Sequence, residues 1–176
     1  SGGQLRMLSA KAQQLGFAPV GDAPGLRGVS GEVLGDGEGL SLQFDPKARM
    51  VFDWPRGFGE AHPIQATGNV ALWREGAGVR VGTGDLRIDG IGYRAHARGG
   101  MWFQNDGTRP WIDIATDIDE ADVAVAKKFW IHHLMPPSAI QWLDMALVGG
   151  KVRNARALVS GDLDDWPFKQ NNGRFC

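Results

Sequence analysis

The sequence has almost no cysteine, no long apolar run and no excess of charge of either sign. The single cysteine, Cys176, is the last of 176 residues, so no disulfide can form within the chain. No stretch reaches the roughly 18 consecutive apolar residues that a membrane-spanning helix needs. Nineteen basic residues balance twenty acidic ones and form no basic block. The chain therefore lacks the charge pattern of a nucleic-acid-binding protein, and we predict no nucleic-acid partner.

The opening of the chain favours a piece of something larger, and the length allows it. The opening SGGQLRMLSA lacks both a starting methionine and the charged-then-apolar plan of a signal peptide. A length of 176 residues, 43% of them hydrophobic, fits one globular domain or one segment of a longer protein. The 26 glycines and 9 prolines separate short ordered runs. We expect a single segment, 1–176, cut from a longer chain.

Apolar residues alternate with polar ones over most of the sequence, which is typical of strands. Leu40, Leu42 and Phe44 share one face of a run that ends at a DPKA turn, and Met50 and Phe52 continue the alternation after it. The pattern predicts a hairpin there. The same alternation recurs at Val70 and Leu72, Val79 and Val81, Leu86 and Ile88, and Ile112 and Ile114.

These runs predict a mostly β fold of about ten short strands, arranged as an antiparallel meander. Ten strands at about 4.8 Å would extend roughly 50 Å. The glycines of the run 82–90 are expected to relieve crowding between strands or to form bulges. A sheet with one apolar face is expected to curl into an open groove, and the strands are expected to occupy 1–117 and to return over 150–176.

The remaining part, 118–149, is predicted to be a helical insert with two short helices. The first, near 119–130, has acidic residues at its start and lysines near its end, as the helix dipole favours. The second, near 137–148, begins at Pro137, and Gly149 and Gly150 are expected to end it.

No residue pattern points firmly to catalysis or to a metal. His132 and His133 are adjacent and lack the spacing of a zinc site, so two ring side chains at a helix exit are the simpler interpretation. The carboxylates have no EF-hand spacing that would favour calcium. They are Asp113, Asp117, Asp119, Glu120 and Asp122. We predict no catalytic residue, no metal and no cofactor.

Seven tryptophans lie mostly at the ends of predicted elements, where an indole covers apolar surface and still donates from its nitrogen. They are typical lids of a core. A carbohydrate-binding sheet is the alternative interpretation.

The second half of the chain carries an ordered set of motifs. They are ADVAVAKKF (121–129), MPP (135–137), WLDMAL (142–147), GDLDDWPF (161–168) and GRF (173–175). In this order and spacing they resemble the YhdP family of AsmA-like proteins, and LGFAPVGDAPGLRGVSGEV near the start resembles that family's strand entry. The resemblance implies a periplasmic portion of an inner-membrane-anchored envelope protein of Gram-negative bacteria, which moves phospholipid toward the outer membrane and supports its permeability barrier.

A lipid conduit predicts that one face of the sheet contacts phospholipid acyl chains, with neighbouring segments of the same long chain and envelope proteins as further partners. The candidate lining residues are those of the alternating runs: Leu40, Leu42, Phe44, Val70, Leu72, Val79, Val81, Leu86, Ile88, Ile112 and Ile114. Alternation marks a buried face without saying what buries it. A non-conducting structural module with a sealed core, and a carbohydrate-binding or metal-dependent domain, therefore remain as alternatives.

Overall fold

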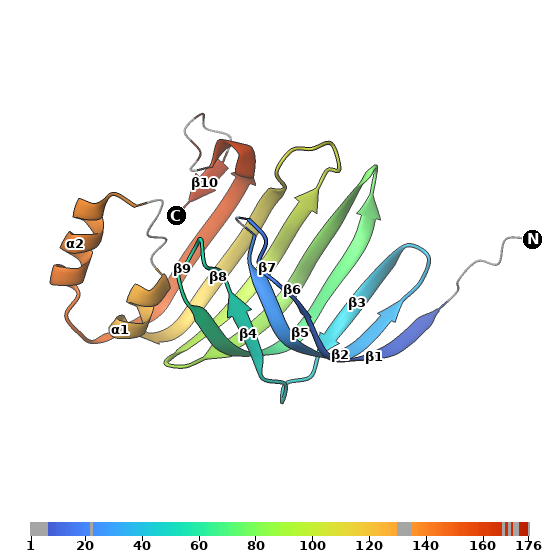
Figure 1. Ribbon diagram of the computed structural model, residues 1–176, viewed down its shortest axis with the longest axis horizontal. Helices are drawn as coiled ribbons and strands as arrows, with labels where there is room; N and C mark the ends of the chain where they lie inside the picture. The colour runs from blue at the N-terminus through green and yellow to red at the C-terminus, as the bar shows by residue number, and fades with distance from the viewer. Residues whose placement is uncertain are drawn as a thin grey trace, which may run out of the picture.

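A computed structural model describes residues 7–21, 23–129, 135–166, 168, 170 and 173–175. One antiparallel sheet of ten strands makes up most of it (Figure 1). The strands are β1 (Leu8–Phe17), β2 (Gly25–Gly35), β3 (Gly39–Phe44), β4 (Met50–Asp53), β5 (Ala61–Glu75), β6 (Gly78–Gly90), β7 (Tyr93–Phe103), β8 (Trp111–Asp122), β9 (Lys151–Asp162) and β10 (Gly173–Phe175). The predicted mostly β fold and its ten strands are confirmed.

The strand order is that of a meander, β1-β2-β3-β5-β6-β7-β8-β9-β10, with β4 beside the path. Both β3 and β4 pair with β2 on one side and with β5 on the other, so they occupy the same position in the sheet. Nine positions at about 4.8 Å give a sheet about 40 Å wide, shorter than ten separate strands would give.

The predicted hairpin at 40–54 is wrong. β3 and β4 are both antiparallel to β2 and do not pair with each other; they are two parts of one line of chain interrupted by a turn at 45–49. The Asp45 carboxylate accepts a hydrogen bond from the Lys47 amide at 2.9 Å, and the Ala48 amide donates to the Asp45 carbonyl. This turn displaces the chain sideways without reversing it. The turn after Glu75, by contrast, does join β5 and β6 as a hairpin.

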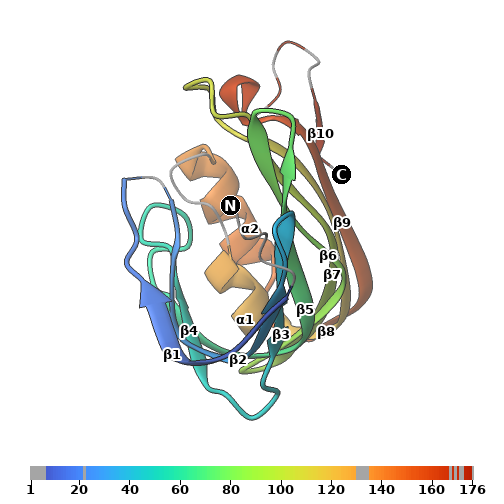
Figure 2. The same cartoon turned by 90° about the vertical axis from the view of Figure 1, so that its right-hand side faces the viewer.

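Irregular pairing in the long strands bends the sheet. The β5–β6 register shifts between Gly68 and Ala71, and β6 shifts against β7 between Thr83 and Leu86. A bulge increases local twist and bend, so these shifts favour curvature, and Figure 2 shows the sheet curving around an inner side. Of the two roles expected for the glycines of the run 82–90, the structure shows a bulge, between Thr83 and Leu86.

The helical insert starts later than predicted. Helix α1 spans only Val123–Ala126, followed by a 3₁₀ turn at Lys127–Phe129. β8 continues to Asp122, so the acidic residues that precede α1 belong to this strand. Among them, Glu120 pairs with Lys151 and Arg153 of β9. Cross-strand ion pairs, not the helix dipole, explain the acidic stretch.

Helix α2, Pro137–Ala146, begins as predicted with proline in its first turn. It ends before the glycines, with Leu147 at the C-cap, and Gly150 instead accepts a hydrogen bond from the Val123 amide. Figure 1 shows both helices beyond β9 at one end of the sheet, and Figure 2 shows them between the two arms of its curve. None of the helices in the described part of the chain has the length and apolarity to span a membrane.

Candidate functional site: the apolar inner face

The eleven candidate residues all lie on one face of the sheet, because directly opposed residues of neighbouring strands share a face. One row crosses five strands through Leu40, Leu72, Val81, Met101 and Ile112. The other candidates fall on the same face by alternation within each strand and across the bulge of β6: Leu42, Phe44, Val70, Val79, Leu86, Ile88 and Ile114. We call this surface the inner face.

The inner face is the side that the helices cover. Tyr93 pairs with Gly90, two residues beyond Ile88, and therefore shares its face. The Phe129 ring, which follows α1, lies 4.9 Å from the Tyr93 ring, centroid to centroid. Because α1 and α2 lie between the arms of the sheet in Figure 2, this is also the concave side.

Burial changes along the strands of the inner face. Phe44 is 8% exposed and forms a core with Val29, Met50 and Ala66. Leu40 and Leu72 are each 41% exposed, near the opposite ends of β3 and β5 from that core. The other eight candidates are half-buried. The protein's own side chains therefore cover the inner face over part of β2–β5 and leave apolar surface open toward the turn that joins β5 to β6.

An aromatic cluster closes the other end of the inner face. The His62 ring stacks on Phe129 with centroids 4.6 Å apart, and Phe58 meets both rings edge-on at 5.7 and 5.1 Å. Trp54 contacts Phe58 in the same way. These contacts tie the segment after α1 to the segment between β4 and β5.

Within this cluster His62 is buried and the other rings are half-buried, and the two titratable groups reflect that burial. His62 is 6% exposed, and burial lowers the pKa of its imidazole because the charged form loses hydration. Burial also raises the pKa of the Tyr93 phenol. Both shifts disfavour the charged form of the side chain. Beside this effect of burial, Glu60 raises the pKa of His62 and Lys128 lowers it, each by less than burial does.

Several inner-face residues escaped the sequence prediction. Met101 lies in the central row, Ala66 and Ala95 are almost fully buried, and Val159 pairs with Ile114. Residues 95, 97, 99 and 101 of β7 alternate onto the inner face. The prediction missed Met101 because Gly99, which has no side chain, interrupts the apolar pattern. Alanine adds little to an apolar alternation pattern in the sequence, although Ala66 and Ala95 lie on the inner face like the leucines.

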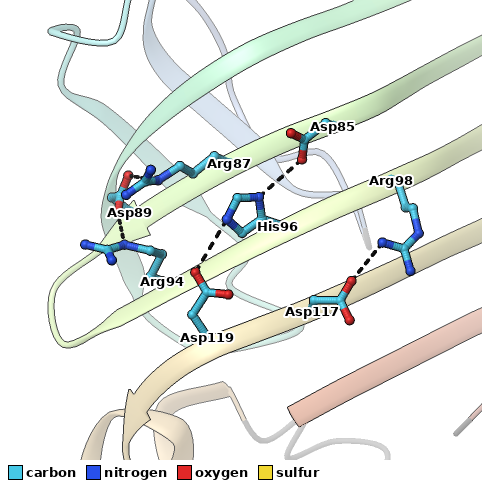
Figure 3. A network of polar contacts seen from close by, with 8 residues as sticks. All are labelled: Asp85, Arg87, Asp89, Arg94, His96, Arg98, Asp117 and Asp119. Atoms are coloured by element: carbon cyan, nitrogen blue, oxygen red, sulfur yellow. Dashed lines mark hydrogen bonds and ion pairs between the residues drawn. The ribbon is translucent and has the colours of Figure 1, made fainter. Parts of the chain in front are cut away.

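The outer face carries charged residues in cross-strand networks (Figure 3). Asp89 lies between Arg87 and Arg94, and the hydrogen bond from Arg94 is the main cause of the lowered pKa of that carboxyl. His96 lies 3.2 Å from Asp85 and 3.4 Å from Asp119. The sheet is therefore apolar inside its curve and largely polar outside.

The acidic residues considered for calcium are mostly engaged in these networks. Asp117 pairs with Arg98 and Arg156 at 2.8 Å each, and Asp119 faces His96. Across the described ranges, no group of three potential metal-ligating side chains gathers. His132 and His133 lie outside the described residues.

At the open end, a hollow of about 410 Å³ lies between the β5–β6 and β7–β8 turns. Val79 and Phe103 of the inner face line it, together with Arg74, Gln104 and Asn105. Phe103 is 43% exposed. The hollow joins apolar inner-face surface to a cation and to amide groups at the rim.

A curved antiparallel sheet with an apolar inner side and a polar outer side defines a β-groove protein. The chain belongs to the YhdP protein family, whose model matches residues 1–176, as its motifs indicated. A protein of Escherichia coli (strain K12) named intermembrane phospholipid transporter YhdP is 32% identical over 89 residues. The alignment covers 50% of this chain and 7% of that relative, so the chain corresponds to a small part of it. No solved structure matches the chain.

Proposed function

We propose that residues 1–176 form one segment of a periplasmic bridge, anchored in the inner membrane, that shields phospholipid acyl chains on their way toward the outer membrane and so supports its permeability barrier. The observation that carries the proposal is the inner face, which is apolar across the strands from β3 to β9 and open along one edge. The family and the name of the relative support the same substrate class.

The physical need for such a face is large. Exposing acyl chains to water costs about 0.8 kcal/mol per methylene, or of the order of 20 kcal/mol for a two-chain phospholipid. An apolar face that covers the tails removes most of that barrier without a precise polar site. A face about 40 Å wide is one section of a path between membranes, with neighbouring segments of a longer chain extending it beyond β1 and β10.

The open rim suits the polar end of a lipid. Acyl chains would lie along Leu72 and Val81, and the headgroup would remain at the hollow beside Arg74. Arg74 makes no ion pair with another described residue, so its guanidinium is free to meet a phosphate.

The proposal is tested with a matched pair of variants on β3. Leu40→Asp places a charge on the open part of the inner face, and Ser41→Asp places the same charge on the opposite face of the same strand. Native mass spectrometry of the purified proteins should detect co-purifying phospholipid with the natural sequence and with Ser41→Asp, and much less with Leu40→Asp. Equal lipid in both variants, or none in any of the three proteins, contradicts the proposal.

A second function is favoured by α2. Trp142, Met145 and Val148 are 64%, 72% and 91% exposed, which leaves apolar side chains on and beside a helix without cover. This observation favours a structural module that docks an envelope protein. If α2 docks such a protein, the double variant Trp142→Ala, Met145→Ala should impair the growth of cells in detergent, a measure of envelope integrity, while lipid still co-purifies with it. If the segment only conducts lipid, cells with the double variant should grow normally in detergent.

A further inference from the structure

The outer face of β5–β8 carries two adjacent rows of very different side chains. The strand register places Trp73, Arg80, Trp102 and Trp111 directly opposite one another in one row. The next row consists of Ala71, Gly82, Gly100 and Asp113. Large side chains therefore stand beside a strip that has almost none. The result is a hollow of about 510 Å³ on the outer face.

Two indoles flank this hollow. The Trp73 ring leans over Gly82, since a Cβ on that glycine would lie 3.3 Å from its Cη2 atom. Trp73 and Trp111 keep 38% and 39% of their surface exposed. They belong to β5 and β8, three strand spacings or about 14 Å apart. Two partly exposed aromatic rings thus line a shallow floor of backbone.

The charged groups in the hollow are of two kinds. Arg80 pairs with Glu75 and lies 5.3 Å above the Trp102 ring, so its charge is already compensated. Asp113 is exposed, and its side-chain carboxylate makes no hydrogen bond or ion pair with any described residue. The hollow therefore offers a free acceptor carboxylate and little free positive charge.

We propose that this hollow binds an uncharged oligosaccharide, with sugar rings stacked on Trp73 and Trp111 and hydroxyl groups donating to Asp113. Indoles supply broad apolar contact to the C–H face of a sugar ring at low entropic cost, and a few placed polar groups orient it. An acidic ligand would be repelled by Asp113. A peptide strand could not pair here, because the strands bordering the floor already pair on both sides. This site lies on the opposite face from the proposed lipid path and is independent of it.

Isothermal titration calorimetry of the purified protein with chitotetraose, cellotetraose and maltotetraose tests the site. We expect saturable binding of at least one of them, weakened about tenfold or more by Trp73→Ala and by Trp111→Ala. Trp142→Ala removes an exposed indole on α2 and should leave binding unchanged. Asp113→Asn removes only the charge and should weaken binding about fivefold.

Two further measurements cover an alanine variant that does not fold and identify the source of the sugar. If an alanine variant does not fold, the indole N–H signals of Trp73 and Trp111, assigned with Trp→Phe variants, should shift on titration while that of Trp142 does not. Vesicles of phosphatidylcholine that carry glucosylceramide distinguish a glycolipid headgroup from a free glycan as the source of the sugar. The proposal is overturned if neither the tetrasaccharides, up to about 10 mM, nor the vesicles bind. It is equally overturned if binding does not depend on Trp73 and Trp111.

Discussion

Phe44 and Leu72 share the inner face but differ in burial, and truncating each to alanine measures how open that face is. Phe44 packs against Val29, Met50 and Ala66, so Phe44→Ala removes buried surface and leaves a cavity, at a cost of about 3–5 kcal/mol. Burying a leucine fully is worth about 1.5–3 kcal/mol, and Leu72 keeps 41% of its surface exposed, so Leu72→Ala should cost only about 1 kcal/mol.

Urea unfolding monitored by far-ultraviolet circular dichroism measures both costs. The slope of the free energy of unfolding against urea concentration should be the same in the two variants, because unfolding exposes nearly the same surface in both. Their free energies of unfolding can then be compared directly. A cost of about 3 kcal/mol or more for Leu72→Ala would mean that the rim of the inner face is packed in solution. The open-groove reasoning would then be refuted.

Three further perturbations follow from the same contacts. Burial lowers the pKa of His62 in the folded protein. Below about pH 6.5 the unfolded chain therefore binds a proton at this histidine that the folded protein does not bind. The free energy of unfolding should then fall as the pH is lowered from about 7.5 to about 5. His62→Phe should flatten that pH dependence, and an unchanged slope contradicts the assignment. Gly99→Ala should cost more than about 2 kcal/mol in thermal melting, because Gly99 has φ +109° and a Cβ would overlap the Asp113 carbonyl oxygen. Gly84→Ala is the control and should stay within about 0.5 kcal/mol, because no described residue apart from its chain neighbours comes within 4 Å of the Cβ position. Asp89→Asn should cost less than about 1 kcal/mol and lose its effect near 1 M NaCl, because the pairs with Arg87 and Arg94 are largely solvated; a large, salt-independent loss would place them in a drier environment.

The alternation of apolar residues was enough to predict the inner face. Leu40, Leu72 and Val81 lie in one row because each falls at the correct phase of its own strand. Phase is a local property, with a period of two residues, so it can be read from short windows of sequence. The fold class followed from the same signal.

Pairing between distant segments could not be read in this way. Phe44 and Met50 have the same phase whether their strands form a hairpin or lie end to end, and only pairing with β2 and β5 decides between the two. The acidic residues before α1 carry a similar ambiguity, because Glu120 suits both a helix start and a cross-strand pair with Lys151. In both places tertiary contacts override the local signal.

The outer hollow was also beyond a local interpretation. The seven tryptophans suggested either core lids or a carbohydrate-binding sheet, and nothing in the sequence indicated that Trp73 and Trp111 flank one strip of small residues. Their placement depends on the register of four strands and on the bulge in β6. Register set by several strands together is the part of this fold that short windows do not contain.

Site-specific photo-crosslinking in cells tests the central claim most directly, because it asks what the inner face touches. A photoreactive amino acid placed at Leu72 or Val81 should yield phospholipid adducts, detected by mass spectrometry. The same group at Thr67 or Ala71, on the outer face of β5, should yield few. Adducts from the inner positions alone agree with a lipid path along the groove, and the absence of any phospholipid adduct from Leu72 and Val81 contradicts it.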